Sequence, residues 1–267
     1  MSAYNIVSVA GSDPSGGAGI QADLKAFSAH GTFGMTVVTA LTAQSTRGVT
    51  GVHPVPVEFV VRQMDTLFGD ATVHAVKVGM LGTSEVTGAV AEAIGRHALA
   101  NVVVDPVMVA KSGDRLLESS AVEALRSELL PRADLITPNL PEAADLLEEP
   151  EAADLAAMRA QAVRLLDLGP RRVLLKGGHL SGGESVDVLV SRDSDPVEFR
   201  APRVATRNTH GTGCTLSSSI AALLPQRPDV AAAVGDAKAY LTEAIRRADG
   251  IDAGGGQGPV HHFHAWW

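Results

Sequence analysis

Cysteine is nearly absent from this sequence of 267 residues, which contains a single thiol at Cys214. One cysteine excludes an intrachain disulfide and any zinc site built from several thiolates, and it fits the reducing conditions of the cytosol. Positive charge is also scarce, because 22 lysines and arginines stand against 30 aspartates and glutamates, for a formal net charge of -8. A chain of that sign argues against nucleic acids and anionic membranes as partners.

Long apolar runs are missing as well. No uninterrupted apolar stretch reaches the roughly 18 to 20 residues that a membrane-spanning helix needs. The first residues, MSAYNIVSVAGSDPSGG, have no basic segment ahead of a hydrophobic one, so they are unlike a secretory signal peptide. We therefore expect a cytoplasmic protein that makes no membrane contact.

The sequence does contain a regular alternation of short β-branched runs and amphipathic helical segments. Leu216, Ile220 and Leu223 fall at i, i+4 and i+7 on one helix face, and residues 20–27 and 230–247 have similar spacing. This order predicts a three-layer α/β fold in which a mostly parallel sheet lies between helices, with residues 1–267 as a single domain. The expected strands are residues 6–10, 36–41, 75–78, 102–104, 135–137, 173–175, 186–190 and 197–200.

A first glycine-rich turn, residues 10–19, leaves the first strand and enters a helix, where free backbone N–H groups favour anions or polar ligands. The turn is not a P-loop, since Gly17 stands where the phosphate-binding lysine is required. It also fails as a dinucleotide-binding fingerprint, because no acidic residue for the ribose lies between Asp23 and Glu58. We expect it to form part of a different ligand site.

A second glycine-rich turn, residues 209–217, precedes another amphipathic helix. Gly211 and Gly213 permit the backbone geometry in which consecutive N–H groups converge on one anion, such as a phosphoryl group in transfer. Cys214 falls in the first helical turn, where we expect the helix dipole to lower its thiol pKa and make it a base. The alternative is that the turn is only a tight connection between a strand and a helix.

Two carboxylates follow predicted strands. Asp105 comes after one buried strand, while Asn139 and Glu142 follow the next strand at the start of a helix. In open α/β sheets the carboxyl ends of the strands border the ligand crevice, so the two carboxylates are candidates to hold Mg²⁺ through waters. Separately, each has a simpler interpretation, as a turn cap for Asp105 and as helix N-terminal charge compensation for Glu142.

Two lysines are candidates for nucleotide contacts. Lys176 ends a strand and precedes two glycines, so its ammonium group is placed to contact ATP phosphates. Lys238 lies at the edge of the apolar stripe of the last helix, which fits either a nucleotide contact or ordinary extension of the ammonium group into solvent.

Two polar segments remain open in their interpretation. Residues 261–264 read His-His-Phe-His, which fits either a metal site or a packed or mobile tail. Residues 110–115 are polar and contain a glycine, so they fit either a loop that closes over a ligand or a plain surface loop.

Taken together, these segments resemble the hydroxymethylpyrimidine/phosphomethylpyrimidine kinases of thiamin biosynthesis, in the ribokinase-like superfamily. The resemblance runs in order from Ile6 almost to the C-terminus and is therefore more specific than either glycine motif. The stretches that carry it are AGSDPSGGAGIQADLK, VTALTAQ, VKVGMLG, VVVDPVMVAKSGDRLL, ITPNLPEA, LLKGGH, THGTGCTLSS and GPVHHF.

The resemblance implies a role for each candidate residue. The pyrimidine would contact Gly11, Asp23 and Gln44, with Met80 and Val107 as apolar walls. The amide of Gln44 suits this task, because it can donate to a ring nitrogen and accept from an exocyclic amine. The implied ATP contacts are Lys176, Thr206, Asn208, Thr212 and Lys238. The implied phosphoryl-transfer residues are Gly211, Gly213, Cys214 and Lys176, and the implied Mg²⁺ region comprises Asp105 and Glu142.

The resemblance further implies two successive ATP-dependent phosphorylations, of the hydroxymethylpyrimidine and then of its monophosphate, by a homodimer. Cys214 favours this branch, since sugar kinases of the superfamily usually carry Asp there and also have a lid insertion that this chain lacks. The nearest alternative is a pyridoxal or pyridoxine kinase. A non-catalytic ligand sensor is disfavoured because Asp105, Lys176 and the glycine turn are all present. The sequence departs from the family only near its end, at residues 253–258 and at His261.

Overall fold

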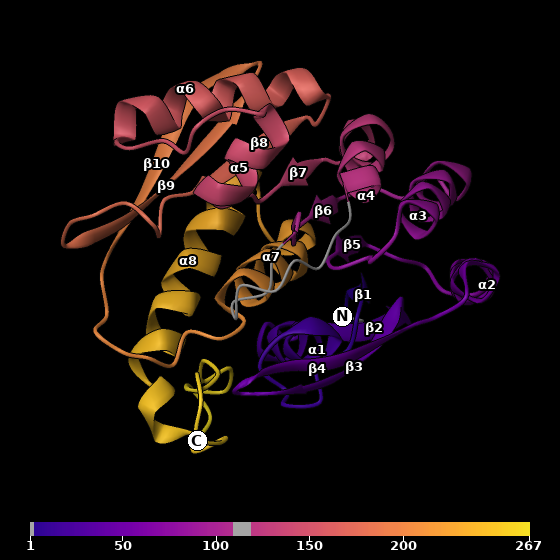
Figure 1. The fold of residues 1–267 in the computed structure, drawn as a ribbon, viewed down its shortest axis with the longest axis horizontal. Helices are drawn as coiled ribbons and strands as arrows, with labels where there is room; N and C mark the ends of the chain where they lie inside the picture. Colours follow the sequence, from indigo (N-terminus) through magenta and orange to yellow (C-terminus); the bar gives the residue numbers. More distant parts are fainter. Residues whose placement is uncertain (1–2, 109–118) are drawn as a thin grey trace.

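The computed structural model describes residues 3–108 and 119–267, which form an eight-stranded sheet covered by helices on both faces (Figure 1). The strand order is β10-β9-β8-β7-β6-β5-β1-β2, and a separate pair, β3-β4, forms a hairpin. The strands are β1 (Asn5–Ala10), β2 (Phe33–Val38), β3 (Ala40–Ser45), β4 (Gly48–Pro54), β5 (Ala75–Val78), β6 (Val102–Val104), β7 (Leu135–Ile136), β8 (Arg172–Lys176), β9 (Glu184–Ser191) and β10 (Ser194–Pro202).

The helices alternate with the parallel strands along the chain. They are α1 (Gly19–Ala29), α2 (Val57–Phe68), α3 (Ser84–Arg96), α4 (Ser119–Ala124), α5 (Leu140–Leu147), α6 (Leu155–Leu165), α7 (Thr212–Leu223) and α8 (Val230–Arg246). Short 3₁₀ or π turns lie at Leu125–Leu129, Leu130–Arg132, Leu166–Leu168, Leu224–Gln226 and Ala248–Gly250. No helix in the described ranges is long and apolar enough to cross a membrane.

Alternate residues of the central strands build two hydrophobic cores. Val102 and Val104 of β6 pack with the cluster under α2 to α6, whereas Val103 packs with the cluster formed by α1, α7 and α8. Successive side chains of a strand point to opposite faces of the sheet, so each central strand contributes to both cores. For this reason the buried parallel strands are continuously apolar. The predicted three-layer α/β fold with a mostly parallel sheet is confirmed, and β9 and β10 add the antiparallel edge.

The predicted strand at residues 36–41 is wrong in its extent. The chain leaves the main sheet at Thr39, whose N–H donates to Ala10 and whose hydroxyl donates to the carbonyl of Met80. It then continues as β3, which pairs with β4 outside the main sheet. The sequence pattern did not indicate β4, because most of its residues are exposed and lack the alternating apolar face of a packed strand.

Candidate active site

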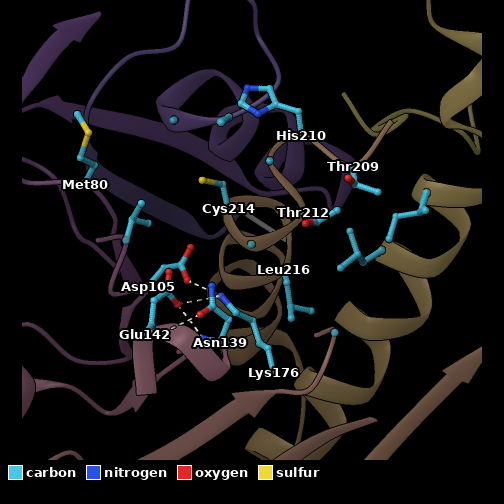
Figure 2. Close-up of a pocket in the computed structure, with 18 of the residues that line it drawn as sticks. Met80, Asp105, Asn139, Glu142, Lys176, Thr209, His210, Thr212, Cys214 and Leu216 are labelled. Carbon is cyan, nitrogen blue, oxygen red and sulfur yellow. Dashed lines mark hydrogen bonds and ion pairs between the residues drawn. The ribbon is translucent and has the colours of Figure 1, made fainter. Parts of the chain in front are cut away.

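A cavity of about 740 Å³ opens at the carboxyl ends of the parallel strands. Its lining comes from the turn after β1, from β3, and from the residues after β5, β6 and β7. The end of β8, residues of β9 and β10, the turn before α7 and one face of α8 also contribute. Figure 2 shows Lys176 beside Asp105 and Glu142, with Cys214 near them at the start of α7 and His210 farther away on the turn that precedes this helix. Parallel topology thus gathers side chains that lie far apart in the sequence.

One end of the cavity holds a lysine between two carboxylates. The Nζ of Lys176 lies 2.9 Å from Oδ1 of Asp105 and 3.9 Å from Oε2 of Glu142. Thr137 donates a further hydrogen bond of 3.0 Å to Oδ1 of Asp105. Burial favours the neutral form of Asp105, but the positive charges of Lys176 and Lys77 outweigh it and lower the carboxyl pKa. The predicted cluster of two carboxylates and a lysine is present in the structure.

Glu142 also closes the N-terminus of α5. Its Oε2 accepts from the backbone N–H of Asn139, whose Oδ1 accepts from the N–H of Glu142 in return, each at 2.8 Å. This reciprocal capping box shows that Glu142 stabilises the N-terminus of α5. Its carboxylate also lines the cavity. Burial raises the pKa of Glu142 to about 7, against the opposing charge of Lys176.

The second glycine turn meets the first one backbone to backbone. Gly211 has a φ of 75°, and a Cβ added there would clash with the carbonyl of Gly17, so this position requires glycine. A Cβ on Gly213 would lie 3.3 Å from Nζ of Lys176 and 3.4 Å from Oδ2 of Asp105. The start of α7 therefore faces the charged cluster, with Thr212 also in the cavity wall.

Cys214 lines the same cavity, but its thiol differs from the sequence-based prediction. Burial raises its pKa to about 11, and the carboxylates of Asp23 and Asp105 add to the effect, while Lys77 opposes it. The prediction that the helix dipole lowers this pKa is therefore wrong. Desolvation at the bottom of the cavity exceeds the favourable field of the helix N-terminus.

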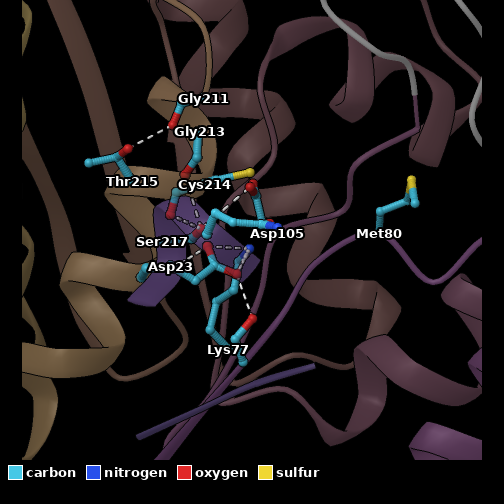
Figure 3. A network of polar contacts seen from close by, with 12 residues as sticks. Asp23, Lys77, Met80, Asp105, Gly211, Gly213, Cys214, Thr215 and Ser217 are labelled. Carbon is cyan, nitrogen blue, oxygen red and sulfur yellow. Dashed lines mark hydrogen bonds and ion pairs between the residues drawn. The ribbon is translucent and has the colours of Figure 1, made fainter. Parts of the chain in front are cut away.

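Asp23 lies beneath the cavity rather than in its wall. It is fully buried and accepts hydrogen bonds from Ser8, Ser218 and Lys77, the last at 2.9 Å to each carboxylate oxygen (Figure 3). The predicted contact of Asp23 with a pyrimidine does not fit this position. Burial disfavours the charged Lys77, but the charge of Asp23 outweighs it and raises the lysine pKa. The signal for this pair was a lysine in the middle of a buried apolar strand.

The predicted pyrimidine-binding residues other than Asp23 line one end of the cavity. Gly11, Gln44, Met80 and Val107 are all in its wall. A Cβ on Gly11 would meet the terminal methyl group of Met80, so the glycine leaves room for this side chain to lie against the turn. The geometry brings together an amide, a glycine and two apolar side chains, which suits a flat heteroaromatic ring.

The sequence analysis did not predict the hydrogen bond that joins the two glycine turns at this end. Nε2 of His210 lies 2.8 Å from Oδ2 of Asp13, and both residues line the cavity. Histidine within the second turn was a visible signal, but its partner 197 positions earlier could not be found from spacing.

The predicted ATP contacts separate into two groups. Lys176, Thr212 and Lys238 line the cavity, whereas Thr206 and Asn208 are absent from its wall and donate to Oδ1 of Asp249 instead. The predicted contacts of Thr206 and Asn208 with ATP therefore do not match their position, because their side chains hold the chain that leads into the second turn.

Lys238 is buried rather than extended into solvent. Its Nζ lies 2.6 Å from Oδ2 of Asp187, a carboxylate in β9 that also accepts from the N–H of Gly177. The pair therefore ties α8 to the loop that follows Lys176. Asp187 was missed, although an acidic residue within a buried apolar strand was its signal.

The histidines near the C-terminus pack rather than gather around a metal. His262 is buried, its Nε2 lies 3.0 Å from Oγ1 of Thr215, and burial lowers its pKa to about 3. Within residues 3–108 and 119–267 no group of three metal-ligating side chains is present. Residues 110–115, the candidate closing loop, fall outside the described residues.

Fold and cavity together define the class of protein. A mostly parallel sheet ends at a cavity that is lined by the apolar Met80 and Val107, a lysine–carboxylate cluster and a glycine turn at a helix N-terminus. This is the arrangement of a ribokinase-like small-molecule kinase. The family model described as phosphomethylpyrimidine kinase matches residues 13–261. The chain belongs to the phosphomethylpyrimidine kinase family, and it is a phosphotransferase.

Individual relatives agree with this assignment. The chain is 52% identical over 267 residues to the hydroxymethylpyrimidine/phosphomethylpyrimidine kinase of Salmonella typhimurium, and the match covers all of both chains. It is 49% identical to a thiamine biosynthesis bifunctional protein of Geobacter sulfurreducens, with 98% of this chain and 52% of that protein covered. A solved structure of Staphylococcus aureus pyridoxal kinase with AMP-PCP and pyridoxal superposes with a TM-score of 0.90 at 30% identity, covering 100% of this chain and 96% of that one. The resemblance predicted from sequence motifs is thus confirmed.

Proposed function

We propose that the chain transfers a phosphoryl group from ATP to 4-amino-5-hydroxymethyl-2-methylpyrimidine and then a second one to the resulting monophosphate, in thiamin biosynthesis. One observation carries this proposal. The cavity joins an end lined by Gln44 and Met80 to an end lined by Lys176 and Lys238, with the start of α7 between them. A single cavity thus suits an aminopyrimidine, an ATP molecule and the phosphoryl group that passes from one to the other.

The chain's own residues supply most of the chemistry. In this proposal, the backbone N–H groups of Gly211 to Cys214 donate to the oxygens of the moving phosphoryl group, since the helix N-terminus is positive there. Lys176, held within 3.3 Å of where a Cβ on Gly213 would stand, adds a cation beside the same point. Lys238 lines the nucleotide end as well, where its charge is shared with Asp187. Positioning and charge neutralisation are the main demands of phosphoryl transfer.

The donor set near Lys176 fits Mg²⁺. Asp105 and Glu142 offer carboxylate oxygens at one end of the cavity, and the lysine now between them shows that this point attracts a cation. We propose that the two carboxylates hold Mg²⁺ through waters, as this ion commonly retains much of its hydration. When bound, Mg²⁺ would neutralise charge on the phosphates.

Cys214 is proposed as the base that takes the proton of the hydroxymethyl group in the first reaction. Because burial raises its pKa to about 11, the thiol is protonated at neutral pH before substrate binds. Its proton must therefore pass to solvent water before the thiolate can accept the hydroxymethyl proton, and the neighbouring cations Lys77 and Lys176 favour that loss. In the second reaction the acceptor is already an anionic phosphate, so no such base is required.

A pyridoxal kinase activity is the second candidate, because the Staphylococcus aureus pyridoxal kinase has the same fold. Its substrate is also a substituted azine with a hydroxymethyl group. The aminopyrimidine is favoured because Gln44 can pair with both a ring nitrogen and an exocyclic amine.

Turnover of ATP against three acceptors tests the assignment. Hydroxymethylpyrimidine, its monophosphate and pyridoxal would each be incubated with ATP, with and without Mg²⁺, and the products separated. We expect the pyrimidine monophosphate and diphosphate to dominate and to require Mg²⁺. Pyridoxal phosphate as the dominant product would overturn the assignment.

We further propose that residues 1–267 form one kinase domain, that two copies associate as a homodimer, and that the protein works in the cytoplasm. The continuous sheet supports the single domain, and the single cysteine supports the cytoplasmic location.

Exposed apolar side chains support the dimer. Leu41 on β3, Val52 on β4 and Phe59 on α2 are each about half exposed, which is unfavourable for large apolar side chains in water. Sedimentation equilibrium at micromolar concentration would give twice the mass of 27.6 kDa if the dimer forms.

A further inference from the structure

His210 lies where three segments of the cavity wall meet. Its ring nitrogen Nε2 is 2.8 Å from Oδ2 of Asp13 in the first glycine turn and 3.4 Å from the amide nitrogen of Gln44 in β3. The backbone N–H of His210 donates to the carbonyl of Gly258, and a Cβ on Gly17 would clash with the imidazole ring. The ring is therefore confined from several sides.

Asp13 decides which atom of His210 carries a proton. Its carboxylate also accepts from the N–H and hydroxyl of Ser15 and from the N–H of Ala18. Burial raises the pKa of Asp13, but these hydrogen bonds and the one to His210 outweigh it and lower the pKa to about 2. An ionised carboxylate can only accept, so Nε2 of His210 must be the donor.

The donor at Nε2 in turn decides which end of the Gln44 amide can face it. Two N–H donors do not pair, so the group facing His210 must be the amide carbonyl oxygen. Thr42 leads to the same conclusion from the other side, because its hydroxyl donates to the carbonyl of Ser12 at 3.0 Å. Its oxygen lies 3.3 Å from Oε1 of Gln44, and with its single proton given to Ser12 it can only accept, so this position requires the NH₂ group instead. A half-turn about the last side-chain bond satisfies both neighbours.

We propose that Asp13 and His210 are positioning residues that orient the Gln44 amide and thereby determine which ring edge the kinase accepts. The carbonyl oxygen of Gln44 faces the His210 side and its NH₂ group faces the Thr42 side. Each keeps one free hydrogen-bonding position for a ligand. This inference rests on the proposed function and adds the origin of its substrate selectivity.

The fixed order of acceptor and donor matches one orientation of the aminopyrimidine. The exocyclic amine donates to the carbonyl oxygen on the His210 side, and the neighbouring ring nitrogen accepts from the NH₂ group on the Thr42 side. The hydroxymethyl group is attached next to the carbon that bears the amine. It is therefore directed toward the turn that continues from His210 into Gly211 to Cys214. The reversed amide would direct it away from that turn.

Pyridoxal cannot use this order. Between its ring nitrogen and the carbon that bears its hydroxymethyl group lies a C–H rather than an amine. A site with a fixed acceptor then leaves that acceptor unpaired when pyridoxal binds, which disfavours it.

The proton on His210 can be observed directly. Long-range ¹H–¹⁵N spectra of histidine rings in the ligand-free protein distinguish a protonated from an unprotonated Nε2, with His210→Gln used to assign the signal. We expect a protonated Nε2. An unprotonated Nε2 with the proton on Nδ1 would overturn the proposal. Because this readout needs no turnover, it stands even if hydroxymethylpyrimidine is not a substrate.

The kinetic test compares the KM values for hydroxymethylpyrimidine and pyridoxal in variants of the residues that orient Gln44. In His210→Phe the ring shape is kept but the donor is lost, so KM for hydroxymethylpyrimidine should rise about tenfold and KM for pyridoxal should change less than about threefold. His210→Gln keeps a donor for both Asp13 and Gln44 and should restore most of the preference. Thr42→Val, which removes the other orienting atom, should reduce it again.

Ser15→Ala is the matched control, because it removes a hydrogen bond to Oδ1 of Asp13, the oxygen that does not contact His210. Its ratio of the two KM values should stay within about twofold of that of the unmodified protein. An unchanged ratio in folded His210→Phe and in Thr42→Val would refute the positioning role.

Discussion

At the scale of single residues, Cys214 has a sulfur atom that could act as a base, but its thiol is protonated at neutral pH. Its thiol lines the cavity at the start of α7, yet burial holds its pKa near 11. A base of that strength removes a proton readily once ionised, but only a small fraction is ionised at neutral pH. Chemistry that uses Cys214 as a base should therefore carry a marked pH dependence.

Replacing Cys214 with Ala should lower kcat for the first phosphorylation by about a hundredfold, the usual scale of a lost general base. The second phosphorylation should fall less than about threefold, because its acceptor is already an anion. Product-resolved kinetics with each purified acceptor measure both. Equal losses in the two reactions would contradict the role of Cys214 as a base.

The pH profile provides the control for the same prediction. In the unmodified protein kcat/KM for the first reaction should rise about tenfold per pH unit between pH 7 and 9, as the free thiol ionises toward its pKa of about 11. The second reaction and the Cys214→Ala variant should lack this slope.

Glu142 gives a prediction on stability. Its folded-state pKa of about 7 exceeds the ordinary value of 4.5, so the folded chain binds the proton more tightly than the unfolded chain. That contribution is complete below pH 4.5 and is lost as the pH rises to about 7. Glu142→Gln keeps the capping box and removes the titration.

Between pH 5 and pH 8 in the absence of Mg²⁺, the unfolding free energy of the unmodified protein should therefore fall by about 1 to 3 kcal/mol more than that of Glu142→Gln. Urea unfolding at the two pH values measures the difference. The same pH dependence of the unfolding free energy in both proteins would show that burial does not raise the pKa of Glu142.

At the scale of elements, the start of α7 depends on two glycines for different reasons. A side chain on Gly213 would enter the space beside Lys176 and Asp105, whereas one on Gly211 would meet the backbone of the other glycine turn. Gly213→Ala should retain the fold and lose at least about a hundredfold in kcat, as for a lost anion-binding group. Thermal unfolding and steady-state kinetics measure the two effects.

Gly211→Ala is the contrasting variant. Its φ of 75° and its contact with Gly17 should make it lose stability first, with a lower melting temperature than Gly213→Ala. If Gly213→Ala unfolds as readily as Gly211→Ala, then the start of α7 is a structural connection rather than an anion site.

The β3–β4 hairpin is held at its tip by the glycine-rich segment near the C-terminus. The N–H of Gln257 donates to the carbonyl of Thr46 at 2.9 Å, and a Cβ on Gly256 would clash with that carbonyl. Because β3 carries Gln44, Gly256→Ala should raise KM for the pyrimidine about threefold to tenfold with little change in kcat. Gly183→Ala, in open space, is the matched control. A kcat effect without a KM effect would contradict this role of the segment.

Strands and helices could be predicted from the sequence where their burial produces a distinct pattern of apolar residues. The strands at residues 75–78 and 102–104 match β5 and β6 in full, since both are buried on two faces. The long helix expected at residues 230–247 is observed as α8 (Val230–Arg246), with a clear apolar stripe. The exposed hairpin strand β4 has no such stripe, and its residues alone did not indicate it.

At the scale of the whole molecule, parallel topology explains which site residues could be predicted. Asp105 and Lys176 end or follow strands, so their meeting at one edge of the sheet follows from the fold class alone. The family resemblance assigned ligand contacts to Asp23, Thr206 and Asn208. In the structure their side chains instead contact Lys77, for Asp23, or Asp249, for the other two. Side-chain direction of this kind depends on tertiary neighbours, which no local pattern encodes.

The contact between the two glycine turns has a consequence for protein synthesis. Its two sides, Gly17 and Gly211, leave the ribosome far apart in time, and closing so long a loop is a late step in folding. A nascent chain that ends before residue 211 already contains every strand of the eight-stranded sheet but lacks the turn proposed to bind the phosphoryl group. Substrates can then stabilise only finished chains, so their concentration in the cell protects completed enzyme and not the unfinished polypeptide.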